Sequence, residues 1–234
     1  MPEQPQEPRR TPLNRDRVLR AAVAFADAAG IEALSMRRLA QELGVVPMAL
    51  YKHVANKEEL LDGMVEVVFA GIEGQVPGSD WKSAVRGRIL GARAALLAHT
   101  WAAQVVRSRT SPTPTVLAYL DSVIGMFRAG GFSTDLTHHM MHALGSRVLG
   151  FTEELFDDPA STSTAPQDDR AQAAAYEAMA RRYPHVTELA RAVAHDRRSV
   201  VGQGCDDRFE FEFALDLLLD GFERLHGEGW TSTP

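Results

Sequence analysis

The chain has 234 residues, 45% of them apolar, which is enough for one large domain or for a small and a larger one. Aromatic residues make up only 7%, a composition that favours helices over sheet. A single cysteine, Cys205, excludes an internal disulfide and cysteine-based zinc sites, and it indicates a reducing compartment. We find neither a signal peptide nor a run of about 18 apolar residues, so we expect a cytoplasmic location and no membrane partner.

The charge is distributed unevenly along the chain. The net charge of −6 argues against nucleic-acid binding when it is taken over the whole molecule. Residues 14–57, however, hold seven basic and four acidic residues, a net charge of +3, so that the remainder carries −9. A basic N-terminal segment can approach DNA even where an acidic body is repelled by it.

The N-terminal elements begin after a flexible tail, residues 1–12, in which four prolines oppose regular structure. Asn14 can cap a first helix that runs to about Ala29 and stops at Gly30. The apolar face of this helix repeats at helical spacing through Val18, Ala22, Phe25 and Ala29.

Three further helices follow in close succession. Ser35 caps a short second helix that ends where Gly44 breaks the chain. Pro47 suits the first turn of a third helix, to about His53, because its missing N–H group has no partner there in any case. Asn56 caps a fourth, long helix that we expect to reach about residue 74.

The remainder of the chain also reads as helical, and no strand pattern is long enough to predict a sheet. The sequence therefore predicts an all-α protein with a flexible tail (1–12), a three-helix helix-turn-helix domain extended by the fourth helix (13–74), and a C-terminal helical ligand-binding and dimerisation domain (75–230). A loop is expected at 157–169. The expected C-terminal helices cover about 79–98, 101–109, 113–129, 133–156, 168–182, 185–197 and 206–226.

The second and third helices, joined by a tight turn at Gly44, have the pattern of a helix-turn-helix. In such a motif the first helix crosses the DNA backbone, and the second presents its N-terminal side chains to base edges in the major groove. Inward-facing apolar residues would pin the two together. The outward set of the second helix would then be Pro47, Met48, Ala49, Tyr51, Lys52 and His53.

The same residues carry a resemblance to a known family. The run Leu34–Ala40, followed by Leu43–Val45, Ala49–Val54 and Asn56–Leu61, resembles the DNA-binding domain of the tetracycline-repressor (TetR) family over about residues 14–64. Phe209–Gly221 resembles the last helix of the branch closest to the tetracycline repressor itself. Residues of about 80–200 are similar to that family in helix pattern only.

The resemblance implies roles for seven residues at a double-stranded DNA operator. Arg37 would reach a phosphate or a guanine edge, and Met48 and Ala49 would face bases, where apolar side chains suit thymine methyl groups. Lys52 would contact a base or a phosphate. Tyr51, His53 and Lys57 would bind phosphates. The repressor carries glutamine where this chain has Pro47, so its operator sequence cannot be transferred.

The C-terminal domain is expected to dimerise and to hold a small-molecule effector. The last helix has an apolar stripe wide enough for both its own domain and a second copy, and we predict a homodimer interface at Phe211, Leu215, Leu218 and Phe222. A fully intramolecular core helix is the alternative. The resemblance also implies a ligand cavity, for which the candidate lining residues are Phe69, Arg93, Trp101, Val105, Met126, His142 and Phe151.

The histidines at 138, 139 and 142 form an incomplete zinc site, so we predict no metal and no cofactor. The stretch Val65–Gly74 lacks the histidine with which the tetracycline repressor contacts its drug, so tetracycline is not the expected ligand.

The expected function is that of a ligand-responsive regulator, a dimeric repressor of an inverted-repeat operator that a small molecule releases. No phosphate-binding loop, nucleophile elbow or HExxH motif points to an enzyme. A helical small-molecule-binding protein without sequence-specific DNA binding is the competing interpretation. Activation instead of repression also remains open.

Overall fold

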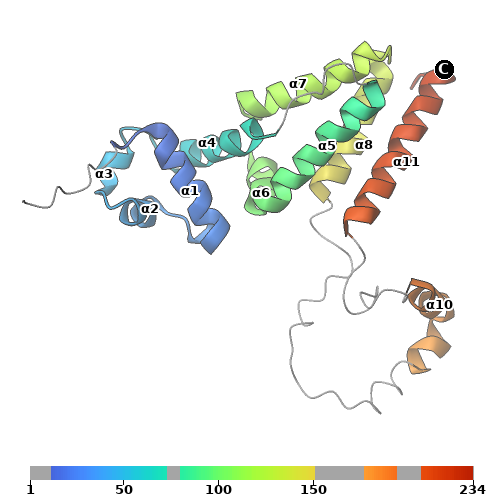
Figure 1. Ribbon diagram of the computed structural model, residues 1–234, viewed down its shortest axis with the longest axis horizontal. Helices are drawn as coiled ribbons and strands as arrows, with labels where there is room; N and C mark the ends of the chain where they lie inside the picture. The colour runs from blue at the N-terminus through green and yellow to red at the C-terminus, as the bar shows by residue number, and fades with distance from the viewer. Residues whose placement is uncertain (1–11, 73–79, 151–176, 194–206, 234) are drawn as a thin grey trace, which may run out of the picture. The chain divides into compact units, whose positions relative to one another are not determined.

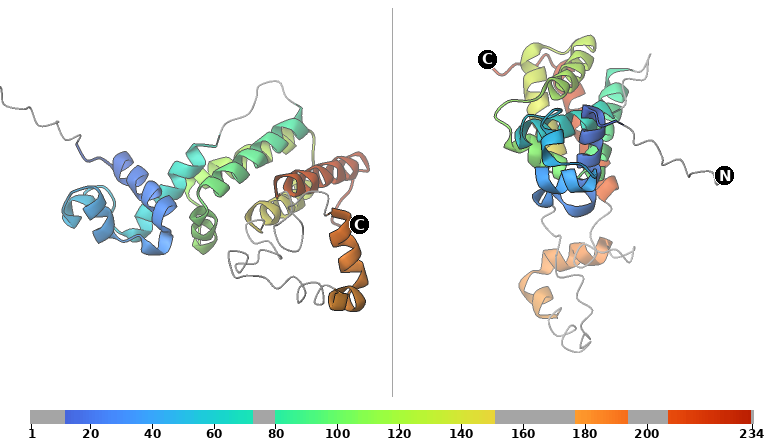
Figure 2. Two further views of the ribbon diagram at one scale, coloured as in Figure 1. Left: turned by 60° about the horizontal axis from the view of Figure 1, so that its bottom comes forward. Right: turned by 90° about the vertical axis from the view of Figure 1, so that its left-hand side faces the viewer.

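The structure is a computed structural model that describes residues 12–72, 80–150, 177–193 and 207–233. All regular elements in these ranges are helices (Figure 1). The chain divides into two compact units, Met1–His142 with Trp230–Pro234 and Ala143–Gly229. In the first unit, α1 to α3 gather at one end and α4 runs from them towards α5, α6 and α7, as the turned view also shows (Figures 1 and 2).

The first helix, α1 (Arg15–Ala29), begins and ends where the sequence predicts. The side chain of Asn14 accepts a hydrogen bond from the backbone N–H of Arg17 at 2.8 Å. Gly30 closes the helix with a φ of +81°, a conformation that costs glycine little. Its buried face is formed by Val18, Leu19, Ala22, Val23 and Ala26. A single 3₁₀ turn, η1 (Ile31–Ala33), leads on to the next helix.

The helices α2 (Met36–Glu42) and α3 (Pro47–Leu50) form the predicted helix-turn-helix pair. Ser35 caps α2 by accepting from the N–H of Arg38 at 3.3 Å, and Gly44 makes the turn with a φ of +65°. The third helix is shorter than expected, because 51–53 form a turn instead of a further helical turn. Two N–H groups, those of His53 and Val54, close this turn on the carbonyl of Leu50.

The helix α4 (Lys57–Ala70) starts at its predicted cap but ends before residue 74. Asn56 accepts from the N–H of Glu59 at 2.8 Å. At the other end, Gly71 and Ile72 donate to the carbonyls of Val68 and Phe69, which tightens the last turn and stops the helix.

The first unit continues through α5 (Trp81–Ala98), α6 (Trp101–Ser108), α7 (Pro114–Ala129) and the start of α8 (Thr134–Gly150). These bounds lie close to the predicted ones, and the predicted extension of α8 to 156 falls outside the described residues. We call α1 to α4 the head and α5 to α7 the body. Within the described ranges no single helix is long and apolar enough to cross a membrane. The helices α5 and α6 would reach the necessary length and hydrophobicity only when taken together, and they are bent by 105° relative to each other.

An aromatic cluster closes the far end of the body. The ring of Trp81 lies 4.6 Å from that of Phe132, which lies 5.6 Å from that of Phe127. A Cβ atom at Gly130 would come within 2.9 Å of Trp81, so only glycine allows this approach. The indole therefore seals the turn between α7 and α8.

In the second unit, the end of α8 is linked to α11 (Asp207–Gly227). The guanidinium of Arg147 donates to the carbonyl of Glu210 at 2.9 Å and lies 5.2 Å from the ring centre of Phe211. The unit also holds α10 (Pro184–Val193), which Pro184 begins, and a helical stretch at 177–182. The predicted loop at 157–169 lies outside the described residues.

Candidate nucleic-acid interface

The helix-turn-helix is held together by a small apolar core. Leu39, Ala40 and Leu50 are fully buried, and the N–H of Val45 donates to the carbonyl of Ala40 at 2.9 Å. Because α3 is short and its one buried side chain is Leu50, the rest of the helix is left on the surface. The motif thus fixes α3 against α2 while presenting its outer side to a partner.

The outer side of α3 carries large apolar groups in contact with solvent. Met48 is 71% exposed and Tyr51 is 44% exposed, whereas Ala49 and His53 are half-buried. Val46, which the sequence analysis did not select, is 66% exposed. Its signal was available, since Val46 is an apolar residue at the predicted turn, directly before Pro47, and an apolar side chain at an N-cap makes no capping hydrogen bond. Exposed apolar side chains grouped beside the turn indicate a contact surface.

The cations around this surface differ from those elsewhere in the head. Arg37, Lys52 and Lys57 are exposed, and none forms an ion pair with any residue that the structure describes. On α1, by contrast, Arg20 pairs with Asp16 at 2.9 Å and Arg15 with Glu66 at 3.5 Å. The helix-turn-helix therefore offers uncompensated positive charge, which suits a phosphate backbone.

The N-terminus of α4 lies next to this charged surface. The carboxylate of Glu59 accepts from the N–H of Ala55 at 2.7 Å, while Asn56 accepts from the N–H of Glu59. This reciprocal cap fixes the start of the helix and the position of Lys57. The N–H groups of a first helical turn have no partners within the helix and can bind an anion.

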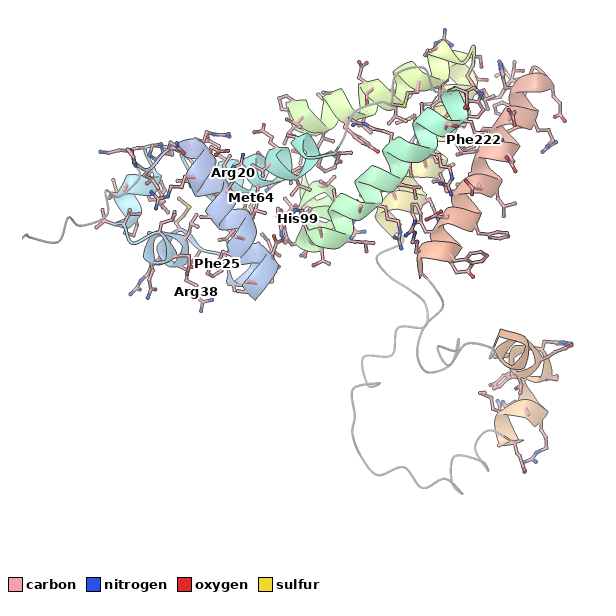
Figure 3. All side chains as sticks on the ribbon, in the orientation of Figure 1. Arg20, Phe25, Arg38, Met64, His99 and Phe222 are labelled. Atoms are coloured by element: carbon pink, nitrogen blue, oxygen red, sulfur yellow. The ribbon has the colours of Figure 1, made fainter. Side chains whose placement is uncertain are left out.

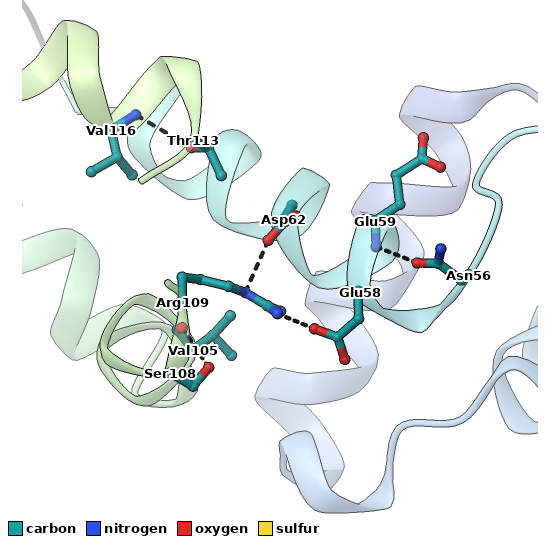
Figure 4. A network of polar contacts seen from close by, with 9 residues as sticks. All are labelled: Asn56, Glu58, Glu59, Asp62, Val105, Ser108, Arg109, Thr113 and Val116. Atoms are coloured by element: carbon teal, nitrogen blue, oxygen red, sulfur yellow. Dashed lines mark hydrogen bonds and ion pairs between the residues drawn. The ribbon is translucent and has the colours of Figure 1, made fainter. Parts of the chain in front are cut away.

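Polar contacts join the head to the body at both ends of α6. The carboxylate of Asp27, at the end of α1, accepts from the indole N–H of Trp101 at 2.7 Å and lies 2.9 Å from Nδ1 of His99. His99, at the end of α5, lies on the side of the body that faces the head (Figure 3). At the other end of α6, Arg109 forms ion pairs with Glu58 and Asp62 of α4 (Figure 4).

The ligand-binding candidates have different environments. The structure buries four of them, on α4, α6 and α7: Phe69, Trp101, Val105 and Met126. Arg93 is half-buried on α5, and His142 is exposed on α8. Phe151 lies outside the described residues. An open cleft of ≈ 590 Å³ runs between α1, α4 and the start of α7, and none of these candidates lines it.

A buried tyrosine and a half-buried arginine form a polar pair in the same body. The hydroxyl of Tyr119 donates to the carbonyl of Arg88 at 3.3 Å, and the guanidinium of Arg88 lies 4.7 Å from the ring centre of Tyr119. Burial raises the pKa of Tyr119 to about 12, although the positive charge of Arg88 acts in the opposite direction. The phenol therefore stays protonated and serves as a hydrogen-bond donor.

The histidine cluster at the start of α8 is exposed. The rings of His138 and His142 lie 4.6 Å apart, and His139 stacks edge-on against Trp230 at 5.5 Å. Ser232 donates two hydrogen bonds to Asp135, which lowers the pKa of that carboxyl. In the described part of the chain, no group of three or more histidine, cysteine or acidic side chains could hold a metal ion.

The residues predicted for the dimer interface occupy one face of α11. Phe211 and Leu215 are fully buried within the single chain, Phe222 is 8% exposed, and Leu218 is half-buried. A second apolar stripe of the same helix is open to solvent: Phe209, Phe213 and Leu217 are 61%, 53% and 57% exposed. Among the described residues of α11, the second stripe is therefore the more exposed of the two.

Comparison with known proteins agrees with this architecture. The family model described as "Tetracyclin repressor-like, C-terminal domain" matches residues 73–225, and the one described as "Bacterial regulatory proteins, tetR family" matches residues 18–64. The HTH-type transcriptional repressor DrrR1 of Streptomyces coeruleorubidus is 32% identical over 224 residues, which cover 91% of this chain and 78% of that protein.

Two solved structures are similar over nearly the whole chain. ActR of Streptomyces coelicolor in complex with actinorhodin has a TM-score of 0.67 at 27% identity, covering 94% of this chain and 100% of that one. BioQ of Mycobacterium smegmatis, bound to its double-stranded DNA operator, has a TM-score of 0.59 at 25% identity, covering 90% and 98%. With its helix-turn-helix, its helical C-terminal part and these matches, the chain belongs to the tetracycline-repressor family of bacterial regulatory proteins.

Proposed function

We propose that this ligand-responsive transcriptional regulator represses its target by binding an inverted-repeat operator as a homodimer, and that a small molecule releases it. The observation that carries the proposal is the outer side of α2 and α3, where cations that form no ion pair with the described residues lie near exposed apolar side chains. The DNA phosphates attract the cations, and base edges in the major groove can contact the apolar side chains. The function needs no catalytic step, and a DNA-bound regulator acts in the cytoplasm.

Each DNA-contacting residue has a role that its position supports. Met48 and Ala49 face base edges, and Arg37 reaches a phosphate or a guanine edge from the backbone-crossing helix. Lys52 contacts a base or a phosphate. Tyr51, His53 and Lys57 bind phosphates, the last beside the N–H groups of α4. These residues belong to a DNA-binding domain of residues 13–74, followed by the ligand-binding and dimerisation domain of residues 75–230.

The dimer follows from the surface of α11. Phe209 and Phe213 stack on each other with ring centres 6.2 Å apart, and Leu217 continues the stripe one turn on. A second copy that covered this stripe would remove three large apolar side chains from water. Two joined heads can read two half-sites on one face of the duplex, which a single head cannot.

The effector is expected to bind within the body. ActR was crystallised with actinorhodin, which supports a small organic ligand for a chain of this fold. Trp101 and Val105 lie on α6, the helix that contacts the head, so a ligand that displaced them would act on the position of the head. A ligand releases DNA only if it binds the released state more tightly.

The first experiment is fluorescence anisotropy with the DNA upstream of the protein's own gene, measured over a salt series. We expect two subunits per site and tighter binding than to scrambled DNA. Lys57→Ala should weaken binding to both DNAs and lower the salt slope by about one, because one phosphate contact is lost. Arg20→Ala is the matched control, since Arg20 already pairs with Asp16.

Each outcome has a distinct meaning. If Lys57→Ala and Arg20→Ala changed the salt slope equally, the proposed phosphate contact would be absent. If the protein bound no DNA even at low salt, the regulator itself would be refuted, and a helical protein that only binds a small molecule would take its place.

A further inference from the structure

The start of α4 carries more negative charge than a phosphate-binding helix end should. Glu58, Glu59 and Asp62 all lie within its first two turns, directly after Lys57. If the helix start meets DNA, as proposed above, unpaired carboxylates there would face the phosphate backbone. Like charges about 4–8 Å apart repel by roughly 0.5–1 kcal/mol each even in water, and by more near a protein surface.

The structure compensates all three carboxylates, and it does so in two ways. Glu59 is used locally, because it accepts the N–H of Ala55 in the reciprocal cap. Glu58 and Asp62, four residues apart on one face of the helix, share a single cation (Figure 4). Nη1 of Arg109 contacts Oε2 of Glu58, and Nε lies 2.9 Å from Oδ1 of Asp62.

Arg109 is positioned by the body and not by the head. It follows α6 as its C-cap residue, with its N–H donating to the carbonyl of Val106 at 3.3 Å. Its side chain is 15% exposed, against 69% for Glu58 and 41% for Asp62, so the guanidinium is the covered member of the group. Thr113 then caps α7, which fixes the connecting segment on its other side.

We propose that Arg109 is a positioning residue for DNA binding, which neutralises Glu58 and Asp62 and so allows the start of α4 to approach a phosphate. The inference rests on the proposed function. Charge compensation at the DNA-binding end of α4 depends on a cation of the body, and it is lost whenever the end of α6 leaves α4. The two carboxylates then oppose the same phosphate that Lys57 attracts.

The test uses the full chain and the operator that the anisotropy experiment proposed above identifies. Arg109→Gln should weaken operator binding at low salt by about tenfold or more, because two carboxylates are left unpaired. The loss should shrink as salt is raised, since screening weakens the repulsion of exposed charges. Arg107→Gln, which removes the same charge two residues earlier, in the last turn of α6, should change affinity by less than about threefold.

A rescue separates charge from packing. Adding Glu58→Gln and Asp62→Asn to Arg109→Gln removes the repelling charges without restoring the cation, and we expect affinity to return to within about threefold of the wild type. Melting temperatures of both variants check that the fold survives. A triple variant as weak as Arg109→Gln alone, or an Arg109→Gln variant that binds like the wild type, would overturn the inference. Failure of the wild type to bind any DNA would instead refute the proposed function.

Discussion

At the scale of single residues, Tyr119 shows how burial sets a protonation state. Its ring packs edge-on against Phe69 of α4 at 5.6 Å, and its hydroxyl donates to a carbonyl of α5. The phenolate would have to form inside the body, away from water, and this raises the pKa of Tyr119 from 10.0 to about 12. Deprotonation of Tyr119 at alkaline pH should therefore lower the stability of the body.

This coupling gives a prediction with a definite sign. The folded chain holds the Tyr119 proton to about pH 12, whereas the unfolded chain releases it near pH 10.0. The stabilisation that the folded state gains from keeping Tyr119 protonated is fully present below pH 10. It is lost as the pH rises from 10 to 12, which lowers the unfolding free energy by up to about 3 kcal/mol. Urea titrations at several alkaline pH values measure it.

Tyr119→Phe is the matched variant for this prediction. It removes the titrating group and the hydrogen bond, so it should cost about 1 kcal/mol at pH 8 but show a shallower loss of stability above pH 10. Equal alkaline slopes for the variant and the wild type would assign the effect to other groups.

At the scale of elements, the head depends on backbone conformations that only a few residues adopt well. Gly44 holds a φ of +65° in the turn between α2 and α3, and a Cβ atom there would meet no other atom within 4 Å. A substitution at Gly44 is therefore disfavoured by the backbone alone. Gly87 also has open space around its Cβ position, but it lies in the middle of α5 without a positive φ.

These two glycines predict opposite effects of the same substitution. Gly44→Ala should lower the unfolding free energy by about 1 kcal/mol, the cost of a left-handed conformation. Gly87→Ala should raise it by about 0.5–1 kcal/mol, because alanine favours a helix interior. Denaturant unfolding measures both. If Gly44→Ala were neutral, the turn would have to tolerate a different conformation from the one described.

The elements also show what the sequence could and could not predict. Caps and stops at Asn14, Ser35, Gly44 and Asn56 were predicted because their chemistry acts within four residues. The sequence predicts that α4 ends at about residue 74, whereas the helix ends at Ala70. The prediction was too long because the hydrophobic spacing continues to Ile72.

Contacts between residues far apart in the sequence could not be predicted from local sequence patterns. The pairing of Asp27 with Trp101 joins residues 74 positions apart, and no local spacing reveals it. Nor could the sequence decide which of the two apolar stripes of α11 its own chain would cover, because both have helical spacing. The predicted interface at Phe211, Leu215, Leu218 and Phe222 stays a prediction, although Phe211 and Leu215 are already buried within the single chain. The DNA contacts and the ligand site remain predictions.

At the scale of the whole molecule, we expect assembly to depend on the exposed stripe of α11, Phe209, Phe213 and Leu217. Phe213→Glu should place a charge in the middle of the proposed interface, yielding monomers at micromolar concentration and a large loss of operator affinity. Sedimentation velocity and anisotropy measure the two effects. Leu117→Glu on α7 is the control, since Leu117 is 52% exposed, close to the 53% of Phe213. A Phe213→Glu variant that stayed dimeric would place the interface elsewhere.

The junction between head and body has a consequence for protein engineering. Around α6, four acids of the head, namely Asp27, Glu32, Glu58 and Asp62, pair with side chains of the segment 99–109. A biosensor made by grafting this head onto a foreign effector domain would inherit four acids without their donors. Successful chimeras would have to carry α6 and Arg109 along with the head, so the useful graft boundary lies after the sixth helix and not at the linker that separates the two domains in sequence.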